Sequence, residues 1–465
     1  MSVREKVREM KAVSPIVASA GAEVRNEVLR LAARSLSEHK EDIFAANRED
    51  LARAEASGIA DAVIKRLRFD EHKLSDCLAG IDSLISLESP TGKITLHRQL
   101  DEGLILKRVT VPIGVIGIIF EARPDALVQI SCLCIKSGNC AVLKGGKETA
   151  STNKVLFDLI AQAASSAGLP ALCLLQVSAH SEIDELLECD DCVDLLIPRG
   201  SNAFVRYIMD HTRIPVMGHS DGICHTYVDR AADFEQAIPI LIDAKTQYTA
   251  ACNSTETLLV HRDIARAFLP VAANALAKAG VKLRGTTEVS EILADSSSVS
   301  VKLPDGAVVS GKQPDGADEP EKQPGGATGS GFAPEDIMGE NDFRTEYLDL
   351  VLSVKLVGSV EEAAAHINRY GSHHTDCILT KDDEAAQRFM ALVDSAGVYR
   401  NCSTRFADGF RYGFGAEVGI STSKLHARGP VGLDGLVTYK YLLEGSGQIV
   451  ADYASGKKSF HFHEI

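Results

Sequence analysis

The sequence contains no tryptophan, and aromatic residues make up only 5% of the chain. It also contains no uninterrupted apolar run long enough to span a bilayer. Residues 1–11 are charged and lack the apolar core of a signal peptide. From these absences we expect no membrane partner and a protein of the cytoplasm.

A surplus of basic residues is absent as well. The 49 Lys and Arg residues against 64 Asp and Glu residues give a formal net charge of -15. Because nucleic-acid phosphates are bound by basic patches, this balance argues against a nucleic-acid partner. It does not exclude an anionic small-molecule substrate, since a local group of Arg and Lys can reverse the potential within one cleft.

The cysteines lack the spacing of a metal site. The chain has 11 of them, mostly single, and the spacing of Cys189 and Cys192 could suggest a redox or zinc pair. No second such pair and no histidine at ligand spacing accompanies them, so we predict no bound metal. Scattered thiols of this kind are typical of a reducing compartment.

Short apolar runs and amphipathic stretches alternate along the chain, whose length suggests roughly two or three domains. Residues 2–90 have helical periodicity, and residues 94–111 alternate polar and apolar residues as a hairpin or edge strands do. Strand and helix patterns alternate over 111–211 and again over 233–401. We therefore predict an α/β fold with mainly parallel sheets covered on both faces.

One segment, 295–331, departs from this texture. Pro-Asp-Gly-Ala or Pro-Gly-Gly-Ala recurs there at Pro304, Pro314 and Pro324, and Gly, Pro, Lys and Asp are abundant. Such a composition cannot bury a core, so we expect a disordered surface insertion that is dispensable for catalysis.

The candidate nucleophile is Cys252. A polar run that ends a predicted helix stops at this residue, and the apolar strand-like run 257–260 begins just after it. A thiolate at such a junction can face a cleft, attack an acyl group and hold it as a thioester. The alternative is a buried structural thiol, because free cysteine is among the most buried residue types.

Three predicted strands end in polar turns that are candidate ligand contacts. Arg123 follows one strand, Lys144 and Lys147 flank a Gly-Gly turn after the next, and Gly200 and Ser201 follow a third. Ligands of open α/β sheets bind beyond the carboxyl ends of the strands. Arginine can grip a carboxylate or a phosphate, and lysines beside glycines can meet a phosphate.

Each of these turns also has a purely structural interpretation. Arg123 can pair with Glu121 or Asp125 at the surface, and Ser201 can serve as a helix N-cap. The Gly-Gly turn does not match the dinucleotide fingerprint G-x-G-x-x-G.

Two further polar turns could hold an anionic substrate or could equally be solvated loops. Arg405 lies in the turn 401–409 after a predicted strand. His426 and Arg428 stand close together in 424–430.

Six segments of the chain occur in an order that resembles the aldehyde dehydrogenase superfamily and, in detail, its gamma-glutamyl phosphate reductase family. They run through nearly the whole chain, and the run 415–430 is especially specific. The resemblance implies an α/β, aldehyde-dehydrogenase-like fold with a Rossmann-type cofactor domain, an α/β catalytic domain and a β oligomerisation arm. The matching segments are 113–125, 138–149, 218–228, 249–260, 401–409 and 415–439.

The resemblance also implies domain borders. Residues 1–236 would hold the N-terminal helices and the NADPH-binding domain, with the oligomerisation arm at 94–111. Residues 237–423 would form the catalytic domain, which carries the insertion 295–331. Residues 424–465 would form a C-terminal oligomerisation segment.

By this resemblance, NADPH would reduce L-glutamyl 5-phosphate to L-glutamate 5-semialdehyde and phosphate in L-proline biosynthesis. Cys252 matches the family nucleophile, which displaces phosphate to give a thioester. Hydride transfer would then give a thiohemiacetal that collapses to the aldehyde. Arg123, Arg405, His426 and Arg428 would bind the substrate.

The same resemblance assigns the cofactor contacts. Lys144 matches the lysine that contacts the cofactor ribose, and Lys147 would reach the 2′-phosphate. Gly200 and Ser201 match the turn near the nicotinamide, and Glu346 matches the glutamate that holds the nicotinamide ribose.

Two departures from the wider superfamily bear on the chemistry. Hydrolytic members carry a glutamate that activates water, whereas the corresponding run 217–222 has none, so a thioester here should resist hydrolysis. Ala122 stands where those members have an asparagine that stabilises the oxyanion. The backbone N–H of Cys252, together with Asn253, would take that role.

Two other functions compete with this one. A non-phosphorylating, NAD-dependent aldehyde dehydrogenase would oxidise a small aldehyde, and a catalytically silent binding protein could share the scaffold. The missing glutamate argues against the first. The joint presence of Cys252, Lys144 and Glu346 argues against the second.

The expected partners follow from the same comparison. No kinase-like region accompanies the reductase segments, so we expect a stand-alone enzyme that receives its substrate from a separate glutamate 5-kinase. An isolated hairpin is marginal by itself. We therefore expect a homodimer or a higher homo-oligomer, built through 94–111 and the tail after Val431.

Overall fold

The computed structural model describes residues 1–177, 181–219, 221–295, 301–302, 308–309 and 332–465. The predicted insertion 295–331 lies outside these residues except for Asp295 and two short paired strands, β10 (Val301–Lys302) and β11 (Val308–Val309). The chain divides into two compact units, Met1–Ser220 with Gly409–Ile465 and Asp221–Asp408. Among the described residues, no helix combines the length and the apolar character that a membrane crossing requires.

This division differs from the expected domain borders at 236 and 423. Residues 221–236 belong to the second unit, because the strand β7 (Cys224–Val228) pairs within its sheet. Residues 409–423 return to the first unit, and 424–465 join them there instead of forming a third unit.

The first unit begins with the helices that the sequence predicts. The Ser2 side chain accepts a hydrogen bond from the Glu5 N–H while the Glu5 side chain reaches back to Ser2, a capping box that starts the first helix. Apolar residues on one face of each helix are buried, as Val3, Val7 and Met10 show for the first. The helices are α1 (Val3–Ser19), α2 (Ala22–Glu38), α3 (Lys40–Ala56), α4 (Asp61–Leu67) and α5 (Glu71–Ser86).

A parallel sheet with the strand order β5-β4-β3-β6 forms the centre of this unit. Its strands are β3 (Val115–Phe120), β4 (Cys140–Lys144), β5 (Leu174–Val177) and β6 (Leu195–Arg199). The central strands β3 and β4 are buried along their whole length, as expected of a sheet covered on both faces. The connecting helices are α6 (Pro124–Ser137), α7 (Ala150–Ser166), α8 (Ser181–Leu187) and α9 (Asn202–His211), with short 3₁₀ turns at Lys147–Thr149 and Ala171–Cys173.

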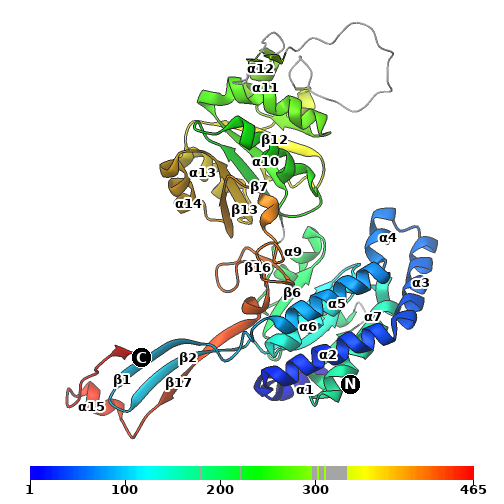
Figure 1. Ribbon diagram of the computed structural model, residues 1–465, viewed down its shortest axis with the longest axis vertical. Helices are drawn as coiled ribbons and strands as arrows, with labels where there is room; N and C mark the ends of the chain where they lie inside the picture. The colour runs from blue at the N-terminus through cyan, green and yellow to red at the C-terminus, as the bar shows by residue number, and fades with distance from the viewer. Residues whose placement is uncertain (178–180, 220, 296–300, 303–307, 310–331) are drawn as a thin grey trace. The chain divides into compact units, whose positions relative to one another are not determined.

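The predicted hairpin is confirmed and belongs to a larger antiparallel sheet. Strands β1 (Ile94–Asp101) and β2 (Leu104–Pro112) pair with each other, and β17 (Val437–Glu444) and β18 (His463–Glu464) complete the order β17-β2-β1-β18 (Figure 1). The remaining elements of this unit are β15 (Gly419–Ser421), β16 (Gly429–Val431), a 3₁₀ turn at Leu433–Leu436 and α15 (Val450–Ala454).

The second unit is a parallel sheet with helices on both faces. Its strand order is β14-β13-β7-β8-β12-β9. Residues of α11 and α12 pack on one face, and residues of α13 and α14 pack on the other. The strands after β7 are β8 (Thr255–His261), β9 (Lys282–Gly285), β12 (Val351–Val357), β13 (Thr375–Leu379) and β14 (Gly397–Arg400).

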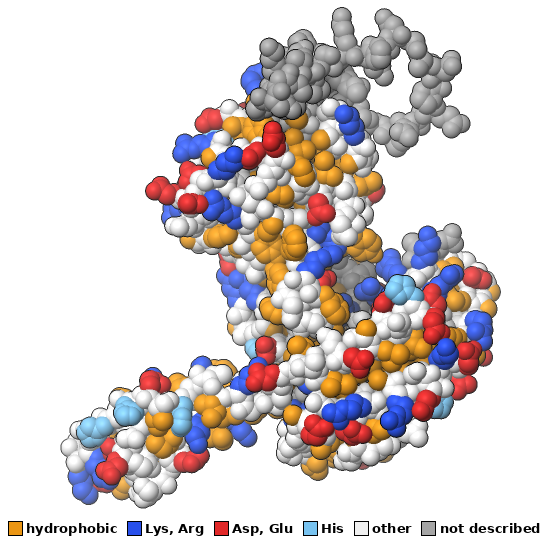
Figure 2. Space-filling view, viewed as in Figure 1, with side chains coloured by type: hydrophobic (Ala, Val, Ile, Leu, Met, Phe, Trp, Pro, Cys, Tyr) orange, Lys and Arg blue, Asp and Glu red, His pale blue; other side chains and the backbone are white. Residues whose placement is uncertain are grey.

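The helices of the second unit alternate with these strands, as the sequence predicts. They are α10 (Phe234–Thr246), α11 (Arg262–Lys278), α12 (Thr287–Asp295), α13 (Val360–Tyr370) and α14 (Asp383–Leu392), with 3₁₀ turns at Pro334–Asp336, Glu340–Arg344 and Thr404–Phe406. On the face that Figure 2 shows, acidic and basic side chains are interspersed over both units, so the net negative charge is not gathered in one patch there.

Candidate active site

Cys252 lies where the sequence places it, in the turn between α10 and β8. All cysteines of the chain are free thiols, and only Cys252 and Cys402 are not fully buried. Burial raises the pKa of every thiol other than Cys252, including that of Cys402, and it raises the pKa of Cys140 to about 12. Since the thiolate is the nucleophile, these cysteines are poor candidates for covalent chemistry.

The Cys252 thiol contacts a histidine that no sequence pattern indicated. His374 Nε2 lies 3.2 Å from Cys252 Sγ, and His374 Nδ1 lies 2.9 Å from Thr375 Oγ1. The imidazole is fully buried. In the tautomer protonated on Nδ1, that N–H donates to Thr375 Oγ1, and Nε2 can accept the thiol proton.

Four segments converge at the amino ends of neighbouring parallel strands in this unit. Cys252 precedes β8, His374 precedes β13, Glu346 precedes β12 and Gly222 precedes β7. A Cβ on Gly222 would lie 2.5 Å from Cys252 Cα and 2.6 Å from Glu346 Oε1. Only glycine fits at this position, because the turn that carries Cys252 and the Glu346 carboxylate both approach it.

Asn253, the predicted oxyanion contact, ties the nucleophile turn to the segment 404–407. Its Nδ2 donates to the Ala407 carbonyl oxygen at 2.8 Å, and the Thr404 hydroxyl donates to its backbone carbonyl at 2.7 Å. The Asn253 side chain therefore braces the turn, and its contact with an oxyanion stays a prediction.

Arg405 lies against the residues that lead to the nucleophile. Its Nε donates to Gln247 Oε1 at 2.9 Å, and its guanidinium carbon is 5.9 Å from the centre of the Tyr248 ring. Arg405 is also largely buried. A guanidinium held in this way is oriented before an anion arrives, as a substrate contact requires.

In the first unit, the predicted cofactor residues lie at the carboxyl ends of β4 and β6, and Glu121 and Ala122 follow the neighbouring strand β3. Glycines let these turns come close together: a Cβ on Gly146 would lie 3.3 Å from the Ala122 N, and one on Gly200 would lie 2.8 Å from Glu121 Oε2. The Ser201 N–H donates to the same carboxylate oxygen at 3.3 Å.

The lysines of this edge differ in their surroundings. Lys144, the last residue of β4, is 7% exposed and donates to the Gly145 carbonyl oxygen at 2.6 Å. Burial lowers its pKa, and nearby carboxylates, including Glu148, act in the opposite direction. Lys147 begins the short 3₁₀ turn that follows the Gly-Gly pair.

The remaining predicted substrate residues belong to the first unit. Arg123 is exposed and forms the N-cap of α6. Its neighbour Ala122 has a left-handed φ of 48°, which turns the chain sharply after β3. His426 and Arg428 lie in the loop between β15 and β16, where His426 is exposed.

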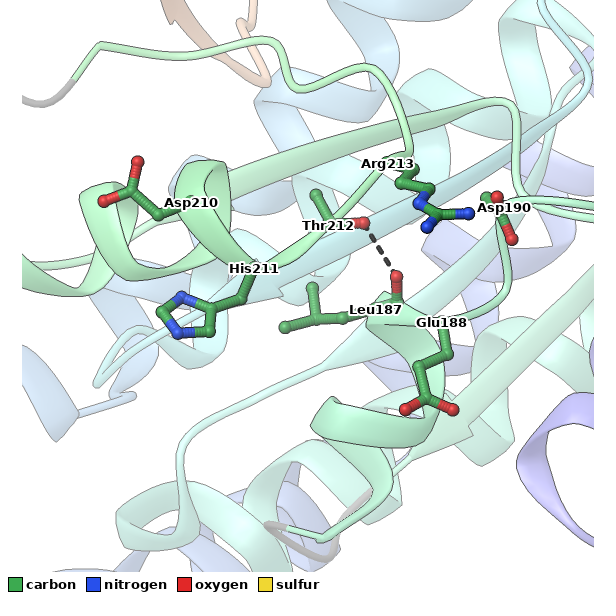
Figure 3. A pocket seen from close by; sticks show the side chains of 7 residues that line it. All are labelled: Leu187, Glu188, Asp190, Asp210, His211, Thr212 and Arg213. Atoms are coloured by element: carbon green, nitrogen blue, oxygen red, sulfur yellow. Dashed lines mark hydrogen bonds between the residues drawn. The ribbon is translucent and has the colours of Figure 1, made fainter.

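A surface hollow in the first unit is separate from these turns. It lies between the ends of α8 and α9 and includes Leu187, Glu188, Asp210 and Arg213 (Figure 3). The Thr212 hydroxyl donates to the Leu187 carbonyl oxygen at 2.8 Å and links the residue after α9 to the end of α8. None of the predicted site residues lines it.

The chain is similar to known proteins along almost its whole length. The family model described as the aldehyde dehydrogenase family matches residues 1–430. The gamma-glutamyl phosphate reductase of Acetivibrio thermocellus is 51% identical over 465 residues, which is 100% of this chain and 99% of the relative.

Solved structures agree with this match. The crystal structure of gamma-glutamyl phosphate reductase from Thermotoga maritima has a TM-score of 0.85 and 34% identity over 96% of this chain and 99% of its own. A glyceraldehyde-3-phosphate dehydrogenase of Methanocaldococcus jannaschii, complexed with NADP, shares the fold with a TM-score of 0.60 and 17% identity, over 96% of this chain and 95% of its own.

Proposed function

Because the chain belongs to the aldehyde dehydrogenase family, and within it to the gamma-glutamyl phosphate reductases, we infer that it reduces L-glutamyl 5-phosphate to L-glutamate 5-semialdehyde and phosphate. This oxidoreductase reaction is a step of L-proline biosynthesis. The observation that carries its chemistry is the contact between Cys252 Sγ and His374 Nε2.

In the proposed mechanism, His374 Nε2 takes the proton of the Cys252 thiol. The thiolate attacks the acyl carbon, the bond to the phosphate oxygen breaks, and the departing phosphate takes up the proton. A thioester on Cys252 remains. After reduction the thiohemiacetal collapses, the aldehyde leaves, and the thiolate regains a proton by way of the same imidazole nitrogen.

The absence of a glutamate from the run 217–222 fits this reaction. The glutamate that hydrolytic members carry there would activate water and divert the thioester to the free acid. The oxyanion that forms during attack would be held by the backbone N–H of Cys252 and by Asn253.

The cofactor is proposed to be NADPH, which supplies the hydride when bound. The carboxyl-end turns fit a dinucleotide because the glycines at 146 and 200 let the turns after β4 and β6 approach Ala122 and Glu121 after β3, and Lys144 ends β4. Lys144 would contact a ribose and Lys147 the 2′-phosphate, while Gly200 and Ser201 would lie near the nicotinamide. Glu346 would hold the nicotinamide ribose.

The substrate carries a carboxylate and a phosphate, so it needs cationic partners. Arg405 is proposed as the main one, because its guanidinium is held by Gln247, which stands shortly before Cys252 in the sequence. Arg123, His426 and Arg428 are proposed as further contacts. The substrate would come from a separate glutamate 5-kinase in the cytoplasm, a reducing compartment that suits a chain whose cysteines are all free.

Phosphate dependence is the test of this function. In the reverse direction, glutamate 5-semialdehyde and NADP should yield more than one NADPH per active site only when inorganic phosphate is present, because the thioester can leave Cys252 only by transfer to phosphate. An equal rate without phosphate would instead indicate the non-phosphorylating aldehyde dehydrogenase.

The nucleophile is tested by Cys252→Ser, which deletes thiolate chemistry but little volume. Turnover should vanish while the affinity for the cofactor stays within about twofold. Cys402→Ser is the matched control, because Cys402 is the other thiol that is not fully buried. If Cys252→Ser keeps a sizeable share of the wild-type rate, Cys252 is not the nucleophile.

The chain is also proposed to form a homo-oligomer through its antiparallel sheet. Tyr439, Tyr441 and Leu443 alternate along β17 and are 54%, 56% and 56% exposed, so one face of this strand presents apolar side chains. Light scattering at micromolar concentration should report at least a dimer, and Tyr441→Asp with Leu443→Asp should reduce the mass. A monomer with full activity would contradict this assembly.

A further inference from the structure

Lys245 and Glu256 form a buried ion pair beneath the nucleophile turn. Lys245 lies in the last turn of α10 and Glu256 is the second residue of β8, so the two flank Cys252 in sequence. Lys245 Nζ is 2.7 Å from Glu256 Oε2, and both side chains have zero exposure. Burial of two charges is costly, and the gain from pairing often only balances it. The pair therefore calls for a role beyond stability.

The second oxygen of Glu256 reaches a different segment. Glu256 Oε1 accepts the Leu348 N–H at 3.4 Å. Leu348 has a φ of 54°, in the left-handed region that a branched side chain rarely adopts. A conformation of this kind persists only where surrounding contacts enforce it. The Glu256 carboxylate supplies one such contact.

Leu348 belongs to the short segment 346–349, which begins with Glu346. The Glu346 carboxylate comes close to the nucleophile turn, since a Cβ on Gly222 would lie 2.6 Å from Glu346 Oε1 and 2.5 Å from Cys252 Cα. Burial lowers the pKa of Lys245, and the carboxylates of Glu256, Asp349 and Glu346 act in the opposite direction.

We propose that Lys245 and Glu256 are positioning residues, which fix the segment 346–349 and thereby aim the Glu346 carboxylate at the nicotinamide ribose of the cofactor. Glu256 holds the backbone two residues after Glu346, and Lys245 holds Glu256 in the geometry that this contact needs. The inference rests on the proposed function for the assignment of Glu346 to the cofactor.

The first test is Glu256→Gln, with the dissociation constant for NADPH measured by fluorescence titration of the full-length protein. An amide oxygen can accept from Lys245 or from Leu348, but it lacks the charge that holds both. We expect NADPH to bind about tenfold more weakly, the effect of roughly one hydrogen bond. The alkylation rate of Cys252 should change less than about twofold, because the Cys252–His374 contact does not involve Glu256.

Asp229→Asn is the matched control for loss of a buried carboxylate. Asp229 accepts from the hydroxyls of Tyr227 and Thr380 at 3.1 and 2.8 Å, beyond the carboxyl end of β7 and thus at the opposite sheet edge from Cys252. Its replacement should lower the unfolding midpoint and leave the NADPH dissociation constant unchanged. An equal loss of NADPH affinity in both variants would reduce the Glu256 effect to general destabilisation and overturn the inference.

The double variant Lys245→Met, Glu256→Leu separates positioning from stability. Replacing both charges with apolar side chains of similar size should leave no unpaired buried charge, so the fold should survive even if the single variants do not. If the pair positions Glu346, NADPH binding stays about tenfold weakened despite the recovered stability. Full NADPH affinity in this variant would overturn the inference.

Glu346→Gln distinguishes the failure of this inference from that of the proposed function. It should weaken NADPH binding, and combining it with Glu256→Gln should weaken binding little further, because Glu256 acts through Glu346. If Glu346→Gln binds NADPH like the wild type, the cofactor assignment itself is wrong. If Glu346→Gln weakens binding and Glu256→Gln does not, only the positioning role fails.

Discussion

The two units place their candidate site residues at opposite edges of similar parallel sheets. In the first unit, the turns with Lys144 and Gly200 follow the carboxyl ends of β4 and β6, whereas in the second, Cys252 and His374 precede the amino ends of β8 and β13. The general rule for open α/β sheets puts ligands at the carboxyl edge. It therefore locates the predicted cofactor turns but not Cys252 and His374.

Buried charged side chains also have different partners in the two units. Arg25 of the first unit is almost fully buried and donates to the carbonyl oxygens of Ala18 and Lys136, near the ends of α1 and α6. These bonds satisfy carbonyls that helices leave open. In the second unit, Lys245 and Glu256 are buried against each other. Arg25 thus closes helix ends in one unit, whereas the Lys245–Glu256 pair flanks Cys252 in the other.

The largest expected effect concerns the residues before the amino ends of β8 and β13 in the second unit. His374→Gln keeps a polar group near Cys252 Sγ but removes the base, so kcat should fall about 10²- to 10⁴-fold, the usual contribution of a general base. Stopped-flow or steady-state reduction of the acyl phosphate measures the loss of kcat.

His373→Asn is the control for that variant. The His373 ring bonds the Asp394 carbonyl oxygen at 2.7 Å rather than the thiol, and its φ of 60° is one that asparagine tolerates. It should retain activity within about threefold, as expected of a surface-type substitution. Equal losses in the two variants would show that the segment matters and the His374 imidazole does not.

A smaller effect is expected for the predicted cofactor turns beyond the carboxyl ends of β4 and β6 in the first unit. Lys147→Glu should weaken NADPH more than NADH, because only NADPH carries the 2′-phosphate, and the difference should amount to about 1–3 kcal/mol. Titrating NADPH and NADH into the wild type, Lys147→Glu and Lys154→Glu measures this difference in binding free energy. Lys154 lies on the exposed surface of α7 and pairs with Asp158, so it controls for a change of charge alone. Equal weakening of NADPH and NADH would place the 2′-phosphate contact elsewhere.

The sequence predicted those parts of the molecule that local pattern encodes. Alternation over 94–111 gave the hairpin, and glycines with lysines at a strand end marked Lys144. Pairing of β17 with β2, such as Tyr441 opposite Arg108, joins distant parts of the chain and has no local signature.

Within the site, the missed residues share a physical reason. His374 stands before a strand, where side chains are usually structural, and its closeness to Cys252 depends on the strand order β13-β7-β8. Glu256 did leave a signal, because a carboxylate inside an otherwise uncharged buried strand needs a partner. The partner, Lys245, follows only from the packing of α10 against β8.

The smallest effect concerns acid stability of the second unit. His366 in α13 is 5% exposed, and neither ring nitrogen has a hydrogen-bond partner among the residues described. Burial, together with the neighbouring His225, lowers its pKa from 6.5 to about 2. The folded state therefore binds fewer protons than the unfolded state below pH 6.5, and stability is lost as the pH falls from about 6.5 toward 2.

His366→Phe should remove this sensitivity, since an aromatic ring keeps the contacts with Phe343 and Tyr370 but takes up no proton. Between pH 6.5 and 5, the wild type should lose about 2 kcal/mol through this residue alone, a loss that the variant avoids. Denaturant midpoints at the two pH values measure the difference, with His72→Phe as the control because its side chain is 84% exposed. If the His366 variant is as acid-sensitive as the wild type, the loss of stability at low pH arises from other titratable groups.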